Sequence, residues 1–395
     1  MNPSIKLPDN ISLATFLSEY WQKKPLFMPA AIAGFTDPLE PDELAGLACE
    51  EGIASRIVIE HGNDQWQTRN GPFTEDSFAE LPTDHWVLLV QDVNRYIREL
   101  DQLLSRFNFI PDWRIDDVMV SYAEPHGSVG PHVDQYDVFL LQGLGSRRWQ
   151  ISQAECGALV PDIDLRILKD FTPEQEFIMQ PGDVLYLPAG VQHHGVGDEV
   201  CMTYSIGFRA PDQFELLSDY VDDCILNNVE RLPRYTDHSL TGSKDSGEIT
   251  AEALNKIVQQ IKQIPSTETA IQHWFGAFIT STNQTAESIP MLVEEDPNAA
   301  FRYIDKFKAA LKQHSILYRD IESRFAYINQ SSGIELFVNG ASLVIADERA
   351  ALARYLCNHR QYQLTDIEHW LNDDASMSIL CAWWQHDLLS FEDDG

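Results

Sequence analysis

Two stretches of the chain decide its fold. Residues 130–142 read GPHVDQYDVFLLQ, and residues 181–194 read PGDVLYLPAGVQHH. Each combines a short apolar run, typical of a β-strand, with histidine and with Gly and Pro turn signals. Alternate side chains of a strand share a face, so we expect His132 and Asp134 to point the same way. The second stretch can bring His193 or His194 beside them.

Short β-rich runs lie within and around both stretches, from Asp117 to Phe208. Gly and Pro separate these runs, which are Val118–Tyr122, Val138–Gln142, Arg148–Ser152, Val184–Leu187 and Met202–Phe208. Regularly spaced short strands with turn signals predict a β-sandwich or a small barrel.

The rest of the 395-residue chain has a different texture. Apolar residues at three- and four-residue spacing predict helices, and these fall at Leu13–Trp21, Phe214–Glu230 and Ala251–Ile264, with a polar loop at Thr236–Ser246. Near the end, Asn339-Gly340 between two apolar runs is a hairpin signal. The runs are Ile334–Val338 and Ser342–Ala346, with helical segments at Arg349–Leu356 and Asp366–Leu371, as in a winged helix. We therefore predict three units, at 1–211, 212–290 and 291–395.

The His, Asp and His set indicates a metal site. Two imidazoles and one carboxylate with open coordination positions are typical of Fe(II) oxygenases, although zinc accepts the same ligands. The open positions can take a bidentate 2-oxo acid and dioxygen. The far carboxylate of such a co-substrate needs a cation, and Arg147 or Arg148 can hold it bidentately.

The net charge of the chain limits the kinds of molecule that it can bind. Acidic residues number 61 and basic residues 28, for a net charge of −33. This balance repels nucleic acids and membrane surfaces, and it either serves solubility or attracts a basic protein. Residues 1–30 hold no apolar segment behind a basic start, and no run approaches the roughly 18 apolar residues of a membrane span. We expect a cytoplasmic protein whose six scattered cysteines stay reduced.

Several motifs together resemble one family, the JmjC (cupin-like) 2-oxoglutarate oxygenases, and within it the ribosomal oxygenase branch. The matching segments are Tyr20-Trp21, Lys23-Lys24-Pro25-Leu26, Gly130–Phe139, Gln142-Gly143, Arg147-Arg148-Trp149, Pro181–Tyr186 and Ser205–Pro211. The resemblance implies an α+β fold: a double-stranded β-helix (jelly-roll) catalytic domain over 1–211, with its metal and co-substrate strands at about 117–208. A helical dimerisation region over 212–290 and a winged-helix-like domain over 291–395 would follow.

The resemblance also assigns roles. It implies that His132, Asp134 and His193 bind Fe(II), with His193 preferred to His194. It implies that Arg147 and Ser121 contact 2-oxoglutarate. The implied reaction is 3-hydroxylation of an arginine in a basic large-subunit ribosomal protein, by a homodimer. From the charge we expect no direct binding of nucleic acid and no membrane association.

Three points stay open at this stage. Tyr136, Asp137 or the unusual loop residue His126 could contact the substrate. The same iron chemistry would also serve an N-methyl demethylase. The chain could also be a non-catalytic protein, either a metal-binding cupin or an adaptor.

Overall fold

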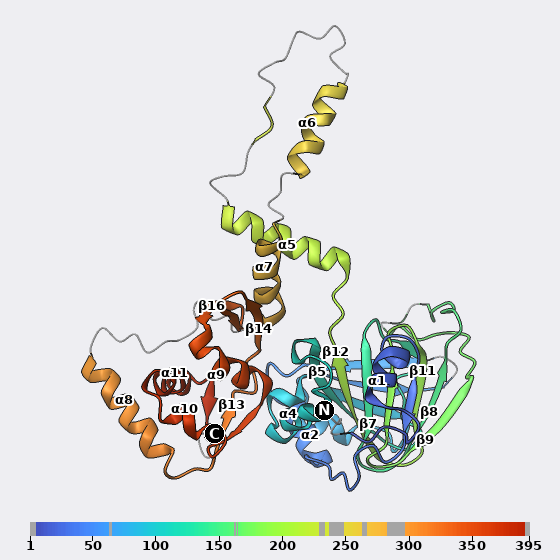
Figure 1. Cartoon of the computed structure of the whole chain (residues 1–395). Coiled ribbons are helices and arrows are strands. Elements are labelled where there is room, and N and C mark those ends of the chain that lie inside the picture. Colours follow the sequence, from blue (N-terminus) through green and yellow to red (C-terminus); the bar gives the residue numbers. More distant parts are fainter. Residues whose placement is uncertain are drawn as a thin grey trace.

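The computed structural model describes residues 5–62, 65–161, 163, 165–228, 234–236, 249–262, 267–282 and 297–391. They form a β-barrel unit, a projecting group of helices and a C-terminal α/β unit (Figure 1). Among these residues no helix is both long and apolar enough to cross a lipid bilayer.

Two antiparallel sheets build the barrel. The larger has the order β1-β10-β7-β12-β5-β4-β2-β3 and the smaller the order β6-β11-β8-β9. The larger sheet comprises β1 (Leu26–Met28), β2 (Ser55–Glu60), β3 (Trp66–Asn70), β4 (Trp86–Val90), β5 (Ile115–Ala123), β7 (Asp137–Gln142), β10 (Val184–Leu187) and β12 (Cys201–Phe208). The smaller comprises β6 (His132–Val133), β8 (Arg147–Ser152), β9 (Gln175–Met179) and β11 (Gln192–Gly197). The predicted jelly-roll barrel is confirmed.

Aromatic rings fill the outer side of the larger sheet. Phe16, Phe139 and Tyr186 are buried, and the Phe16 ring centroid lies 5.2 Å from that of Tyr186. Short helices carry or flank these rings: α1 (Leu13–Thr15), η1 (Phe16–Tyr20), α2 (Pro41–Leu47), α3 (Glu75–Ala79), η2 (Val93–Arg95), α4 (Arg98–Leu104), η3 (Ser105–Phe107) and η4 (Asp112–Arg114). The predicted first helix is therefore present as α1 and η1.

A β-bulge interrupts the pairing of β5 with β12. Ile206 pairs with Val118 and Phe208 pairs with Ile115, so Asp116 and Asp117 both stand opposite Gly207. An extra residue of this kind bends the strand and redirects side chains, and bulges are common beside active sites.

Of the three helices that follow the barrel, the first two project away from it, whereas the third leads back to the C-terminal unit (Figure 1). They are α5 (Gln213–Asn228), α6 (Ala251–Lys262) and α7 (Glu268–Thr280). The two helices predicted here are confirmed, although Glu230, Ile264 and the predicted loop beyond Thr236 lie outside the described residues. Trp274 of α7 ties to α5, because its indole N–H donates to Asp219 at 2.7 Å.

The C-terminal unit has its own apolar core. Its elements are α8 (Pro297–Ala310), β13 (Ile316–Arg319), β14 (Phe325–Gln330), β15 (Gly333–Val338), β16 (Ala341–Ala346), α9 (Asp347–Asn358), β17 (Gln361–Gln363), α10 (Glu368–Leu371), α11 (Asp374–Gln385) and β18 (Leu389–Ser390). Asn339 and Gly340, with φ of 49° and 86°, make the predicted hairpin turn between β15 and β16.

Candidate metal centre and co-substrate pocket

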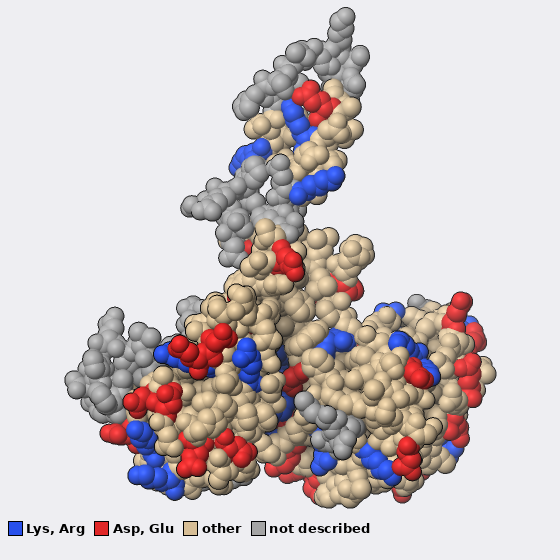
Figure 2. Space-filling view, viewed as in Figure 1, with Lys and Arg blue, Asp and Glu red and all other residues tan. Residues whose placement is uncertain are grey.

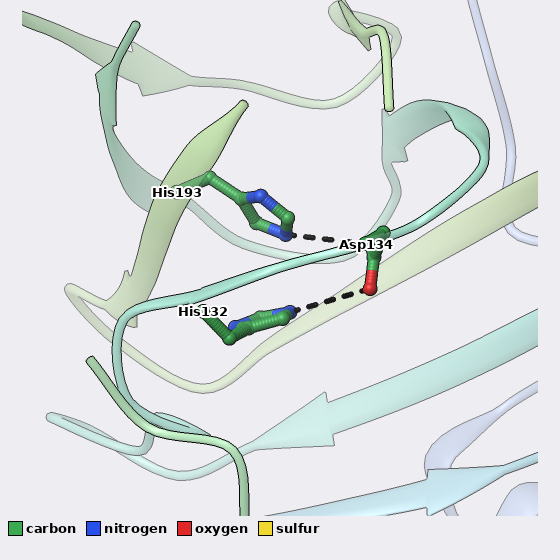
Figure 3. A group of neighbouring side chains, drawn as sticks. All are labelled: His132, Asp134 and His193. Carbon is green, nitrogen blue, oxygen red and sulfur yellow. Dashed lines mark ion pairs between the residues drawn. The ribbon is translucent and has the colours of Figure 1, made fainter. Parts of the chain in front are cut away.

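Three side chains converge at one end of the smaller sheet. His132 on β6 pairs directly with His193 on β11, and Asp134 follows β6 (Figure 3). The Nε2 atoms of His132 and His193 lie 4.0 and 3.5 Å from the two carboxylate oxygens of Asp134. One ligand atom from each residue lies within 4.8 Å of the other two, a spacing that one metal ion can bridge.

The backbone orients both imidazoles. The Nδ1 atom of His132 lies 2.9 Å from the carbonyl oxygen of Gly130, and that of His193 lies 3.0 Å from the carbonyl of Val191. A carbonyl accepts only from a protonated Nδ1, so each ring presents an unprotonated Nε2 to the centre when neutral. Burial, reinforced by His132, keeps the pKa of His193 well below its usual value. Both rings are thus arranged as metal ligands.

Asp134 reaches the site differently from the sequence expectation. Strand β6 ends at Val133, so Asp134 lies just beyond it and not within it. Its carbonyl accepts a hydrogen bond from the backbone N–H of Gly190 at 2.8 Å, which fixes the turn beside His193. Burial raises the pKa of its carboxyl group, against the opposing effects of His132 and Arg56. A carboxylate held in this way is stabilised by a cation.

His194 stands apart from this group. It pairs with Gln150 on β8, and its ring lies 6.1 Å from that of Phe171. Because side chains alternate along β11, His194 faces the side of the sheet opposite His193. Burial lowers the pKa of His194 to about 4.

Arg147 lies deep in the barrel, with 2% of its surface exposed. Its guanidinium donates to Ser121 Oγ at 3.1 Å and to the carbonyl of Gly195 at 3.3 Å. A Cβ atom at Gly195 would lie 2.8 Å from Arg147 Nε, so this close approach requires glycine. Arg148 points outward and pairs with Glu176 and Asp198 at 2.7 and 3.2 Å.

A cavity of about 130 Å³ joins the triad to Arg147. Three buried N–H groups on its walls have no hydrogen-bond partner among the described residues: Arg56 Nε, Arg147 Nε and Trp149 Nε1. Buried donors are nearly always satisfied, so donors left over in a pocket point to an acceptor that belongs there. A dicarboxylate that also reaches the triad fits these donors.

One wall of the cavity is acidic and aromatic. Asp117, Tyr136 and Gly207 line it, and Tyr136 is 41% exposed, which places this wall at the mouth of the cavity. A Cβ atom at Gly207 would lie 3.1 Å from Asp117 Oδ1 and 3.7 Å from Tyr136 Cε2, so glycine keeps the gap between these two side chains, called the slot below, free of a side chain. Burial, with the nearby charges of Asp116 and Asp92, raises the pKa of Asp117 to about 7.

The other two residues that the sequence left open lie elsewhere. Asp137 is fully buried and accepts hydrogen bonds from Tyr186 Oη at 2.6 Å and Gln22 Nε2 at 3.0 Å. His126 is in a loop, where its ring lies 5.1 Å from that of His85. Neither residue lines the cavity.

Comparison with known proteins agrees with this geometry. Residues 102–216 match the JmjC domain, and residues 259–390 match the ROXA-like winged helix. The chain is 36% identical to the ribosomal protein uL16 3-hydroxylase of Escherichia coli over 305 residues, which cover 77% of this chain and 79% of the relative. The chain belongs to the JmjC ribosomal oxygenases. The recognised family and the winged helix are thus confirmed.

Other members of the ribosomal oxygenases support the assignment. A probable ribosomal oxygenase of Haemophilus influenzae is 41% identical over 215 residues, 53% of each chain. The crystal structure of Escherichia coli ycfD superposes with a TM-score of 0.79 at 31% identity, covering 99% of this chain and 100% of that one. The same Escherichia coli protein has been solved with cobalt and 2-oxoglutarate, and that structure has a TM-score of 0.76.

The predicted boundaries between the three units are not tested by these comparisons. The winged-helix match begins at residue 259, inside the segment 212–290 that the sequence assigns to dimerisation. The divisions at 211 and 290 stay predictions, as do the individual ligand roles of His132, Asp134, His193, Arg147 and Ser121.

Proposed function

We propose that this ribosomal oxygenase 3-hydroxylates an arginine side chain of the large-subunit protein uL16, using Fe(II), 2-oxoglutarate and dioxygen. The observation that carries the proposal is a single cavity with a His, Asp and His cluster, a buried arginine and an acidic mouth. The uL16 3-hydroxylase of Escherichia coli supports the choice of substrate.

His132, Asp134 and His193 would hold the iron. They supply two neutral nitrogens and one carboxylate, the donor set that leaves open positions on Fe(II) for exchangeable ligands. The chemistry of such a centre is activation of dioxygen coupled to decarboxylation of 2-oxoglutarate. The carbonyls of Gly130 and Val191 hold both imidazoles in place while ligands exchange.

Arg147 would bind the far carboxylate of 2-oxoglutarate. Its buried guanidinium stays charged, and its Nε still lacks an acceptor. Ser121 accepts one of its other N–H groups, which fixes the fork of the guanidinium, and the Trp149 ring lies 5.1 Å from the guanidinium carbon. The far end of the co-substrate would therefore be anchored at a defined distance from the triad.

The slot beside Gly207 would receive the substrate arginine. A guanidinium there would meet the carboxylate of Asp117, a charge partner, and the ring of Tyr136, an aromatic partner. This placement holds the side chain near the triad while its backbone stays outside. The net charge of −33 would attract a basic ribosomal protein, although the face in Figure 2 shows acidic and basic side chains interspersed.

The test is hydroxylation of purified uL16. The protein, Fe(II), 2-oxoglutarate and uL16 should yield uL16 heavier by one oxygen atom, and fragment masses should place that atom on one arginine. uL16 in which that arginine is replaced by lysine serves as the matched control and should stay unmodified. Absence of a product with uL16 contradicts the substrate assignment.

The same experiment separates the alternatives. A methyl-arginine or methyl-lysine peptide that releases formaldehyde would indicate a demethylase. Failure to consume 2-oxoglutarate with any ribosomal protein would favour a non-catalytic cupin. From the net charge we also propose that the protein does not bind nucleic acid directly, which a binding titration with RNA and DNA would test.

We also propose that the projecting helices form a homodimer. On α6, Leu254, Ile257, Val258 and Ile261 are 42–62% exposed and recur at helical spacing. On α5, Phe214 and Leu226 are 80% and 78% exposed. Exposed apolar patches of this kind usually mark an interface. A ribosomal substrate would place the dimer in the cytoplasm.

A further inference from the structure

The β-bulge at the pocket mouth is clamped from outside the barrel. Arg209, just after β12, donates from Nε to Asp116 Oδ1 at 2.9 Å and from Nη1 to the carbonyl of Ile279 at the end of α7. Asp116 and Asp117 are the two bulge residues that stand opposite Gly207. The position of Asp117 in the slot therefore depends on what holds Asp116.

Arg324 of the C-terminal unit is the second clamp. Its Nη2 donates to the backbone carbonyl of Asp116 at 2.9 Å and lies 3.8 Å from Asp116 Oδ1. Its own backbone N–H donates to Asn339 Oδ1 at 2.9 Å, and Asn339 Nδ2 donates to Ser323 Oγ at 3.0 Å. The turn between β15 and β16 thus fixes the arginine that grips the barrel strand.

Further ion pairs join the barrel unit and the C-terminal unit at this junction. Arg360 binds Asp101 and Asp112, and Arg319 donates to Asp112 at 3.0 Å. The charged side chains in these ion pairs are largely buried. Buried pairs tolerate less change of geometry than exposed pairs, so they favour one orientation of the C-terminal unit relative to the barrel. Movement of the C-terminal unit would accordingly be transmitted to Asp116.

We propose that Arg324 is a positioning residue for Asp117, through which the C-terminal unit sets the affinity for the substrate arginine. The proposal rests on the arginine substrate argued above. Arg324 acts in two ways: its hydrogen bond holds the bulge in shape, and its positive charge offsets that of Asp116 beside Asp117.

The charges around Asp117 give this proposal a specific signature. Asp92 and Asp116 favour its protonated form, and Arg95 opposes them. Tyr136 faces the same slot. Only ionised Asp117 pairs with a guanidinium, so the KM for substrate should rise as the pH falls through about 7. Loss of Arg324 leaves the charge of Asp116 less compensated and should move this rise to higher pH.

The experiment compares Arg324→Gln with the unaltered full-length protein, using uL16 as substrate across the pH range. The KM for uL16 should increase about tenfold near neutral pH. In a plot of this KM against pH, the rise on the acid side (the acid limb) should move to higher pH. The KM for 2-oxoglutarate should stay within about twofold, since Arg147 is untouched. Arg324→Lys should recover part of the loss. Arg354→Gln is the matched control, because Arg354 binds Asn329 on the exposed side of the same unit.

Asp116→Asn tests the charge effect in the opposite direction. It removes the negative neighbour, so the acid limb should move to lower pH; this variant also carries the test if Arg324→Gln fails to fold. Unchanged pH profiles and substrate KM in both variants overturn the inference. If the unaltered protein does not hydroxylate any arginine, the proposed function fails instead, which is a distinguishable result.

Discussion

The barrel and the projecting helices leave opposite kinds of group unsatisfied. Among the described residues of the barrel, the buried side-chain groups without a hydrogen-bond partner are polar, and three of these N–H donors belong to residues that line one cavity. On α5 and α6 the groups left over are apolar and face outward. Unsatisfied donors in a buried cavity indicate a small polar ligand, whereas an exposed apolar face indicates contact with another protein surface. The two regions therefore predict different partners from one physical rule.

The largest effect should come from the triad. His193→Ala removes one nitrogen ligand, and hydroxylation of uL16 should fall by about a thousandfold or more, because the iron loses its site. Mass spectrometry of the product and Fe(II) binding by calorimetry measure the two effects. His194→Ala is the control one residue away, on the opposite face of β11. Equal losses in both variants would contradict the ligand assignment.

The second effect concerns the co-substrate. Arg147→Met keeps the apolar stem but removes the buried cation, so the KM for 2-oxoglutarate should rise by about a hundredfold while Fe(II) binding persists. Arg148→Met serves as the control, because Arg148 pairs with exposed carboxylates on the outer face. If the KM for 2-oxoglutarate rises only in the Arg148 variant, the assignment of Arg147 to the co-substrate is wrong.

The third effect belongs to the projecting helices. Leu254→Asp with Ile261→Asp places charges on the exposed apolar face of α6, and light scattering at micromolar concentration should show monomers in place of dimers. Ile178→Asp is a matched control, since Ile178 on β9 is 49% exposed but belongs to the barrel. A monomeric unaltered protein would remove the dimer proposal altogether.

Much of the barrel could be predicted because its strands are short, regular and punctuated by turns. The strand predicted at Val184–Leu187 has the predicted bounds, and the one at Arg148–Ser152 begins one residue earlier, at Arg147. The candidate metal ligands could also be predicted, since histidine and aspartate beside a turn can be recognised in the sequence alone. Alternation along β8 and β11 then separates Arg147 from Arg148 and His193 from His194.

The wall of the pocket could not be predicted in the same way. Asp117 lines the cavity together with Met119 and Ser121, because alternate side chains of β5 share a face, but its place opposite Gly207 depends on pairing with the distant strand β12. Arg56 and Trp149 line the cavity through the closure of the barrel. The sequence offered Asp137 and His126 as candidates because they are near the ligands in the chain, whereas the fold turns Asp137 into a hydrogen bond with Tyr186.

The smallest effect tests the cost of keeping Asp117 in the slot. Its pKa of about 7 in the folded protein exceeds the value of about 3.9 expected when unfolded. A carboxyl group with a raised pKa favours the folded state below its unfolded pKa, and this contribution is lost as the pH rises through about 7. Asp117→Asn should therefore raise the Tm by roughly a few degrees at about pH 8, and by less at about pH 5.

The same variant should lose affinity for uL16, since the amide cannot pair with a guanidinium. Differential scanning calorimetry at both pH values measures the stability, and Asp374→Asn on α11, far along the chain in the C-terminal unit, controls for removal of a carboxylate. A pH-independent difference in Tm would mean that Asp117 is not the carboxylate whose burial opposes folding. A stabilised variant with weakened substrate binding would show that the barrel tolerates an unfavourable charge at its mouth because the reaction needs one there.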